Sequence, residues 1–210
     1  WTGFDYRGEP TPFKWPSVSS QFGIMDTCGF PKDSYYFHQA IFLDAPMMHI
    51  LPHWNWQEGD KIDMWVYYNT ADEVELFVNG RSLGRSRKTD TRLHALWEGV
   101  AFEPGEITAV GYKDGVEIMR HTRVTAGEPA LLTLTADRTT IEADGYDLSY
   151  VTIDCTDADG NFMPTAMNQL YLSVEGAGEL VGADNGNAAG GESLKGNHIK
   201  LFNGKALAII

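Results

Sequence analysis

The sequence predicts a mainly β protein that contains two consecutive antiparallel β-sandwiches. Short stretches of alternating apolar and polar residues recur about every eight to twelve residues. Glycine-containing pairs that favour tight turns separate these stretches. The chain has 210 residues, 43% of them hydrophobic, so it can bury sizeable cores. The first 45 residues depart from this pattern because they are rich in aromatic residues and proline.

The clearest pair of strands lies within residues 62–83, IDMWVYYNTADEVELFVNGRSL. Ile, Met, Val and Tyr occupy every second position at 62–68, and the alternation resumes at 74–78 after a polar break. Asn79 and Gly80 follow directly, and both tolerate the positive φ angles of a two-residue hairpin turn. The pattern therefore predicts two strands, a tight turn and the start of a return strand.

The rest of the first sandwich is expected within residues 59–127. Short alternating runs predict further strands at 94–97, 107–113 and 116–124. The basic run RSRKTD at 85–90 contains three cations and no aromatic residue. We therefore expect a solvated hairpin there, because a nucleic-acid site would need a broader basic surface.

A second sandwich is expected at residues 128–210, with an immunoglobulin-like fold. Strand signals occur at 130–136, 148–156, 170–174, 178–183 and 198–202. The glycine-rich run 182–191, GADNGNAAGG, lacks the features of a phosphate loop, and we expect a mobile surface loop. The apolar run at 206–210 has no polar cap, and the chain opens on Trp1 without an initiator methionine. We read this domain as truncated, without its last strand or strands.

No cofactor and no metal site are expected. The DADGN motif at 157–161 imitates half of a calcium loop, but the bidentate glutamate farther along is missing, so an Asp-Gly turn is predicted. His49 and His53 have the spacing of a helical metal pair, but Pro52 removes that helix. The two cysteines are far apart in sequence, and Cys155 shares the apolar side of a predicted strand, so it should be a small buried residue.

Charge and hydropathy argue against two classes of partner. The net charge is −13, with 29 acidic and 16 basic residues and no long run of either sign. Attraction to nucleic acid or to an anionic membrane is therefore not expected. No run approaches the roughly 18 to 20 apolar residues of a membrane-spanning helix.

Residues 1–45 predict an irregular, aromatic region. Three prolines within 8–20 rule out a regular helix or interior strand there. A short helix is expected through 35–42, with Asp33 or Ser34 as its cap. A loop so rich in Trp, Tyr, Phe and Pro should pack against another surface or hold a ligand.

These motifs resemble a known family. Residues 1–33 contain WTGFDYRGEPTPF, SSQFGIMD and GFPKD, and they resemble the end of the catalytic (β/α)8 barrel in bacterial β-galactosidases of glycoside hydrolase family 2. PHWNW at 52–56 and VELFVNGRSLG at 74–84 resemble the β-sandwich that follows this barrel. The resemblance covers essentially the whole chain and is most specific at the barrel end and in PHWNW.

The resemblance implies four regions. Residues 1–45 would be a remnant of the catalytic barrel, namely the end of its last strand, a loop and a helix. Residues 46–58 would bridge to an accessory β-sandwich at 59–127, and residues 128–210 would form the immunoglobulin-like domain.

Catalysis in this family uses two glutamates, an acid/base and a nucleophile, and retaining enzymes hold such a pair about 5 Å apart. The resemblance places both glutamates on earlier barrel strands, so no catalytic residue is expected here and the chain should be inactive alone. Asp5 and Glu9 do not replace them, because they lie in a loop with Gly8 and Pro10 in which nothing fixes their separation.

The resemblance does imply substrate-binding residues, because the chemistry of such barrels sits at the C-terminal mouth of their strands. Trp1 would place its indole face against galactose in the sugar pocket. Asp5 would accept a sugar hydroxyl or order the loop. Tyr6 and Arg7 are further candidates, although Arg7 could equally clamp the loop to a backbone carbonyl.

Three residues of the PHWNW motif are candidates for a domain interface. Trp54 and Trp56 would form the apolar contact between sandwich and barrel, and His53 would wedge between them by hydrogen bonding.

The function implied is that of a non-catalytic C-terminal part of a retaining β-galactosidase that supplies one wall of the sugar pocket. Its partners would be the catalytic barrel and a galactoside, in a periplasmic or extracellular setting. Glucuronides and mannosides remain open as substrates. The alternative is a stand-alone carbohydrate-binding or structural β-sandwich module, against which Trp65, Tyr67 and Phe77 fit core packing better than an exposed platform.

Overall fold

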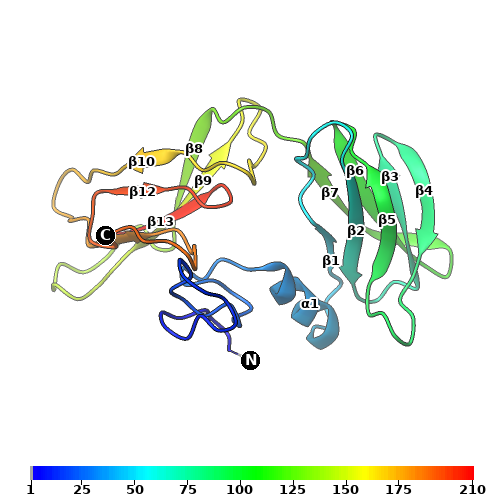
Figure 1. Ribbon diagram of the computed structural model, residues 1–210, viewed down its shortest axis with the longest axis horizontal. Helices are drawn as coiled ribbons and strands as arrows, with labels where there is room; N and C mark the ends of the chain where they lie inside the picture. Colours follow the sequence, from blue (N-terminus) through cyan, green and yellow to red (C-terminus); the bar gives the residue numbers. More distant parts are fainter. Residues whose placement is uncertain (1) are drawn as a thin grey trace. The chain divides into compact units, whose positions relative to one another are not determined.

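The computed structural model in Figure 1 describes residues 2–210. The predicted class is confirmed: antiparallel sheets form sandwich-like domains, and one short helix precedes them. The chain divides into two compact units, residues 32–125 and residues 126–210 together with the described residues up to Pro31. That residues 1–45 belong to the end of a barrel stays a prediction. No helix within residues 2–210 has the length and apolar character to cross a membrane.

The first sandwich, residues 32–125, is built from two antiparallel sheets (Figure 1). One sheet has the strand order β1-β2-β5 and the other the order β4-β3-β6-β7. The strands are β1 Met48–Leu51, β2 Lys61–Tyr68, β3 Glu73–Val78, β4 Arg81–Ser86, β5 Ala95–Ala101, β6 Glu106–Lys113 and β7 Val116–Val124.

The core of this sandwich consists of the alternate residues that the sequence pattern selects. Met64, Val66 and Leu76 are fully buried between the sheets. Burying a side chain of this size contributes about 1.5–3 kcal/mol, so these positions fix which face of each strand points inward. Asn79 and Gly80 have φ angles of 48° and 78°, which confirms the predicted hairpin turn between β3 and β4.

Helix α1 (Asp33–Phe42) belongs to the same unit. Its packing against the sheet involves Tyr36, Phe37, Ala40, Met47, Leu51 and Tyr67. The expected cap by Asp33 or Ser34 is wrong, because Lys32 occupies the cap position and no side chain caps the helix. Asp33 is instead the first helical residue, and its carboxylate lies 2.9 Å from Nε2 of His49.

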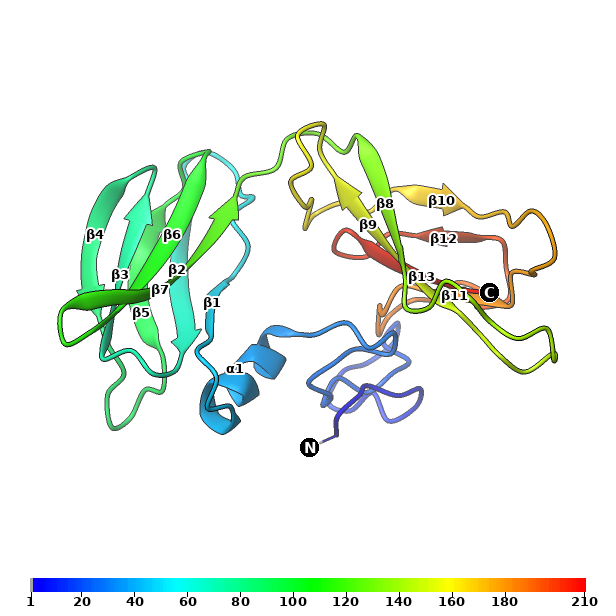
Figure 2. The ribbon, with the colours of Figure 1, turned by 180° about the vertical axis from the view of Figure 1, so that it is seen from behind.

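The second sandwich consists of a four-stranded and a two-stranded sheet (Figure 2). One has the strand order β11-β13-β9-β8, and the other pairs β10 with β12. The strands are β8 Leu131–Ala136, β9 Tyr150–Thr156, β10 Gln169–Tyr171, β11 Gly182–Asp184, β12 His198–Lys200 and β13 Lys205–Ile209. Ile153, Cys155, Ile199 and Leu201 lie in its core, so the burial expected for Cys155 is confirmed.

Sequence reasoning missed two strands: β1, which lies in the expected bridge at 46–58, and β13. Strand β13 is the more informative case. It lies between β9 and β11 and pairs with both. Ala206, Leu207 and Ala208 are all buried. A strand covered on both faces has no reason to alternate, which is why residues 206–210 read as a plain apolar run.

The expectation of a surface loop throughout 182–191 is wrong. Its first three residues form β11, and Asn185 is only 4% exposed. Nδ2 of Asn185 donates to the carbonyl of Lys200 at 2.9 Å, and its Oδ1 accepts from the backbone N–H of Asn187 at 3.0 Å. A buried amide thus orders the loop, and glycine content alone did not reveal this.

The predicted Asp-Gly turn is confirmed at the DADGN motif, where Gly160 has a φ angle of 85°. Asp157 accepts hydrogen bonds from the backbone N–H groups of Gly127, Asp159 and Asn161. These bonds, with the side chain of Asn161, lower the pKa of Asp157 to about 2. Its carboxylate therefore organises the turn.

Candidate functional site

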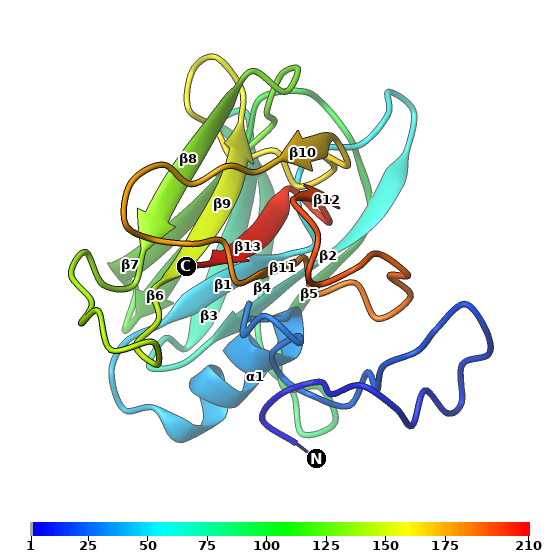
Figure 3. The ribbon, with the colours of Figure 1, turned by 90° about the vertical axis from the view of Figure 1, so that its left-hand side faces the viewer.

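The N-terminal segment, residues 2–31, contains no helix or regular strand in its described part (Figure 3). Its order comes from hydrogen bonds between two runs of the segment. The N–H of Asp5 donates to the carbonyl of Met25 at 2.9 Å, and the N–H of Gly8 donates to that of Val18 at 2.9 Å. Residues 4–8 therefore lie along residues 18–25, and the predicted irregular loop is a fixed structure.

Asp5 lies at the centre of this arrangement. It is 7% exposed, and its Oδ1 accepts a 2.8 Å hydrogen bond from the N–H of Gly23. A Cβ on Gly23 would lie 2.2 Å from the nitrogen of Asp5, so only glycine fits. The geometry gives Asp5 a loop-ordering role, and its contact with a sugar stays a prediction.

Of the other predicted substrate-binding residues, two lie at the surface and one lies outside residues 2–210, which the structure describes. Tyr6 is 39% exposed, and its hydroxyl donates to the carboxylate of Glu9, which raises the pKa of Tyr6. Arg7 is exposed and forms a backbone bridge with Ser19. Trp1 lies outside the described residues. Binding of a sugar by Trp1, Tyr6 and Arg7 stays a prediction.

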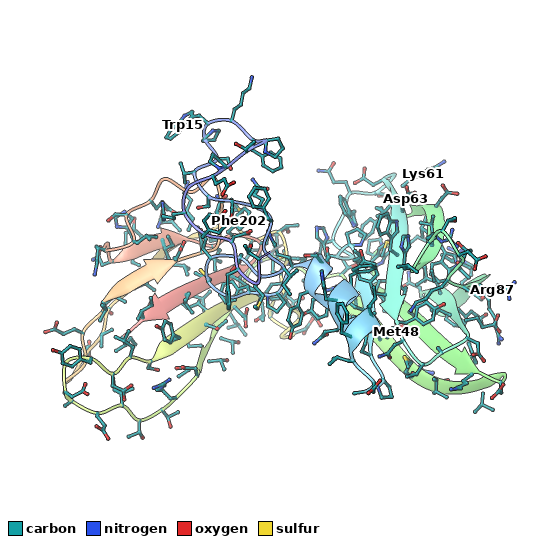
Figure 4. The ribbon with its side chains drawn as sticks, turned by 90° about the horizontal axis from the view of Figure 1, so that it is seen from below. Trp15, Met48, Lys61, Asp63, Arg87 and Phe202 are labelled. Atoms are coloured by element: carbon teal, nitrogen blue, oxygen red, sulfur yellow. The ribbon has the colours of Figure 1, made fainter. Side chains whose placement is uncertain are left out.

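Two exposed aromatic residues were not singled out from the sequence. Phe13 is 49% exposed and Trp15 is 82% exposed, beside Pro12 and Pro16. Figure 4 shows Trp15 at the outer end of the segment. Aromatic side chains beside prolines in a fixed loop are the signal that could have selected them, because such a loop can hold a ring in place.

The second sandwich holds the N-terminal segment through its 185–190 loop (Figures 1 and 2). The carbonyl oxygen of Ala188 accepts two backbone hydrogen bonds, from Val18 at 2.8 Å and from Ser19 at 3.1 Å. The hydroxyl of Thr27 lies 3.2 Å from Oδ2 of Asp184, to which it donates. The segment is thus anchored at both its middle and its end.

Carboxylates concentrate where the segment meets the sandwich. Oδ1 of Asp26 accepts from the N–H groups of Cys28 at 2.8 Å and Phe30 at 2.9 Å. Burial raises the pKa of Asp26 to about 6, and the charges of Asp184 and Asp5 add to this effect. Burial also raises the pKa of the Cys28 thiol, with Asp184 and Asp26 contributing.

Lys205 supplies a positive charge beside the segment. Its ammonium group pairs with Asp154 and lies 5.2 Å from the ring centre of Phe30 and 5.0 Å from that of Phe162. This places one cation between a residue of the segment and a residue of the sandwich.

Two family descriptions match the chain. Residues 132–210 match the glycoside hydrolase family 2 C-terminal domain 5, and residues 59–119 match a domain of unknown function (DUF4982). Over its whole length the chain is 49% identical to the beta-galactosidase BoGH2A of Bacteroides ovatus. The chain carries C-terminal domains of glycoside hydrolase family 2.

Two solved structures share the fold over the full chain. A beta-glycosidase from Bacteroides vulgatus is 35% identical with a TM-score of 0.90, and a family 2 member from Bacteroides cellulosilyticus is 31% identical with a TM-score of 0.91. A putative beta-glucuronidase of Formosa agariphila is 36% identical over 98% of the chain. The chain spans 25% of BoGH2A, 20% of the Formosa protein, and 26% and 32% of the two structures.

The PHWNW motif of these family 2 domains divides into a core residue and a surface pair. Trp54 is 1% exposed, packs edge-on against Phe102 and donates its indole N–H to the carbonyl of Glu103 at 3.1 Å. Trp56 is 38% exposed, donates to the carbonyl of His53 at 2.8 Å and stacks on its ring. Trp54 therefore stabilises the first sandwich itself, and the interface role of the three residues stays a prediction.

His49 takes part in a polar cluster of the first sandwich. Its ring lies 2.9 Å from the carboxylate of Asp33 and 3.3 Å from Nη2 of Arg123. Burial lowers the pKa of His49. Among residues 2–210, no group of three or more His, Cys, Asp or Glu side chains is arranged to hold a metal ion.

Proposed function

We propose that this chain acts as the non-catalytic C-terminal part of a retaining β-galactosidase, in which the N-terminal segment supplies one wall of the sugar pocket. The two catalytic glutamates would be contributed by a barrel outside these 210 residues. The sandwiches would serve as accessory domains that support this wall.

One observation carries this proposal. The N-terminal segment is rigidly hydrogen-bonded yet leaves Tyr6, Phe13 and Trp15 exposed, at 39%, 49% and 82%. Exposing such large apolar rings on a fixed loop is costly in water unless a ligand or another domain covers them. Aromatic faces suit the apolar faces of sugar rings, so the segment fits the wall of a carbohydrate pocket.

The substrate class is proposed as a terminal β-galactoside. BoGH2A, the relative with 49% identity, is a beta-galactosidase by name. Relatives named beta-glucuronidase are 36% and 33% identical over shorter parts of the chain. A β-glucuronide is therefore the first substrate to compare with a β-galactoside.

The first test is turnover by the 210-residue chain. The purified chain should not hydrolyse a chromogenic β-galactoside or β-glucuronide, because an acid/base and nucleophile pair at about 5 Å is not expected among its residues. Robust turnover would show that the chain contains its own catalytic pair. In an enzyme that joins the chain to a catalytic barrel, we expect turnover of the galactoside, and replacing Trp15 with Ala should raise KM.

A second candidate function rests on Trp65. The core packing expected for Trp65 is wrong, because its side chain is 37% exposed on the outer side of β2, whereas Tyr67 is buried. The ring of Trp65 stacks on that of His94 with 4.2 Å between ring centres and 12° between planes. An exposed, oriented indole is the kind of surface on which a sugar ring can stack. This favours a carbohydrate-binding role for the first sandwich.

Calorimetric titration of the chain with a β-galactan polymer separates the two functions. Binding that disappears in Trp65→Ala but persists in Trp15→Ala would favour the carbohydrate-binding module. If both variants bind no worse than the parent chain, neither aromatic surface serves as a sugar platform.

A further inference from the structure

The contacts around Gly186 link the second sandwich to the N-terminal segment. Gly186 has a φ angle of 75°, and a Cβ added there would lie 2.0 Å from Oδ2 of Asp26. Two residues farther along, the carbonyl of Ala188 accepts the N–H groups of Val18 and Ser19. The same short loop therefore touches the segment at two places that are separated along the sequence.

The loop has its own internal bracing. Asn185 is 4% exposed and bonds to both Lys200 and Asn187, while Oδ1 of Asn187 accepts from the N–H of Ala189 at 3.0 Å. These bonds fix where the carbonyl of Ala188 points. Because that carbonyl takes two donors from the segment, the position of Val18 and Ser19 depends on the loop.

We propose that the 185–190 loop of the second sandwich is a positioning clamp that sets the placement of the N-terminal segment and thereby the geometry of the sugar pocket. The statement about the sugar pocket rests on the proposed function, whereas the placement of the segment does not. The clamp gives the second sandwich a role in substrate binding, although none of its residues needs to touch the sugar.

Gly186→Ala is the variant that separates loop and segment, because its methyl group would occupy the space of the Asp26 carboxylate. Two matched control variants separate the effect of this steric clash from other effects of a Gly→Ala change. Gly191→Ala changes the exposed glycine that directly follows the 185–190 loop, with nothing within 4 Å of the new Cβ. Gly145→Ala has a φ angle of 79° and open space around its Cβ, so it reproduces the backbone strain without the clash.

Hydrogen exchange on the 210-residue chain provides the structural readout. In Gly186→Ala, exchange of amides within residues 17–27 should rise about tenfold, while amides of β9 and β13 keep the protection seen in Gly145→Ala. Equal exchange of residues 17–27 in all three variants would overturn the clamp. If Gly186→Ala does not fold, Asn187→Ala replaces it, since it removes the side-chain acceptor of the Ala189 N–H within the loop. About threefold faster exchange of residues 17–27 is then expected, and unchanged exchange overturns the clamp.

Kinetics in an enzyme that joins this chain to a catalytic barrel provide the functional readout. Gly186→Ala should raise KM for a β-galactoside about tenfold, with a smaller change in kcat, whereas Gly191→Ala leaves both unchanged. If hydrogen exchange in the N-terminal segment rises in Gly186→Ala but KM does not change, the loop does hold the segment, but it does not set the geometry of the sugar pocket. If the unsubstituted enzyme does not hydrolyse the β-galactoside, while exchange of residues 17–27 still rises in Gly186→Ala, the proposed function is overturned and the clamp is not.

Discussion

The ring of His49 stacks face to face on that of Tyr36, with 3.6 Å between ring centres and 8° between planes. This pair joins helix α1 to strand β1, because Tyr36 lies on the helix and His49 on the strand. Nearby on β7, His121 accepts the backbone N–H of Ile50 through Nδ1 at 3.3 Å. The contacts of His49 and His121 thus connect helix α1 with strands β1 and β7.

The first sandwich should lose stability as the solution is acidified. Burial lowers the pKa of His121 to about 4 from 6.5, and the charge of Arg123 adds to this. A base whose folded pKa is depressed contributes stability above its unfolded pKa, and the contribution falls as pH drops from 6.5 to 4. His121 is partly exposed, so we expect about 1–3 kcal/mol after allowance for solvent screening.

Urea unfolding followed by tryptophan fluorescence checks this pH dependence, because four of the six tryptophans lie in the first sandwich. His121→Gln should flatten the curve between pH 6.5 and 4, whereas replacing the exposed His198 of the second sandwich should not. Identical slopes for the parent chain and His121→Gln would contradict the assignment.

The unit that contains the N-terminal segment and the second sandwich should show the opposite pH dependence at Asp26. The pKa of Asp26 is raised from 3.8 to about 6 by burial, so ionisation opposes folding as pH rises from 3.8 to 6. Asp26→Asn should remove this loss and stabilise the chain at pH 7 by about 1–2 kcal/mol, because its amide oxygen still accepts from Cys28 and Phe30. Hydrogen exchange in β9, corrected for the intrinsic effect of pH, measures it.

Asp157 is the contrasting control, because its pKa is lowered to about 2 and its stabilising contribution is lost only as pH falls from 3.8 toward that value. Asp157→Asn should therefore destabilise at pH 7. A destabilising effect of Asp26→Asn at pH 7 would show that the buried carboxylate is stabilised by its hydrogen bonds more than it is penalised by burial.

Gly23→Ala should separate residues 4–8 from residues 18–25 of the N-terminal segment, because the new Cβ would lie 2.2 Å from the backbone nitrogen of Asp5. A clash with backbone cannot relax by rotating a side chain, and a cost of about 2–4 kcal/mol is expected. The rate of Cys28 alkylation measures the opening of the segment. Gly3→Ala, with nothing within 4 Å of its Cβ, should leave that rate unchanged.

Trp54 and Trp56 should differ sharply in their contribution to stability. Trp54→Ala empties a core site and is expected to cost about 3–5 kcal/mol, whereas the exposed ring of Trp56 should cost less than about 1 kcal/mol. Urea unfolding of the chain compares the two. Should Trp56→Ala weaken an enzyme that includes the barrel but not the chain alone, the predicted interface role of Trp56 would gain support.

The sequence by itself determined the elements whose faces differ. Met64 of β2 follows the polar Asp63, and Leu76 of β3 follows the polar Glu75. The Asn79-Gly80 pair has the backbone freedom that its turn demands. In such stretches the polarity of each side chain is sufficient to predict the strand, because it indicates which face of the strand is buried. The family motifs likewise lie in contiguous runs and could be recognised without coordinates.

Tertiary structure alone decided what depends on distant partners. Strand β13 is covered on both faces, so Ala206 and Leu207 carry no alternating signal, and only its pairing with β9 and β11 defines it. The loop at Asn185 appeared mobile from its glycines, yet it is fixed by a buried amide and by donors about 170 residues away at Val18 and Ser19. Hydrogen bonds between segments so far apart leave no periodic trace in either one, because each donor or acceptor is an ordinary backbone group until the chain folds.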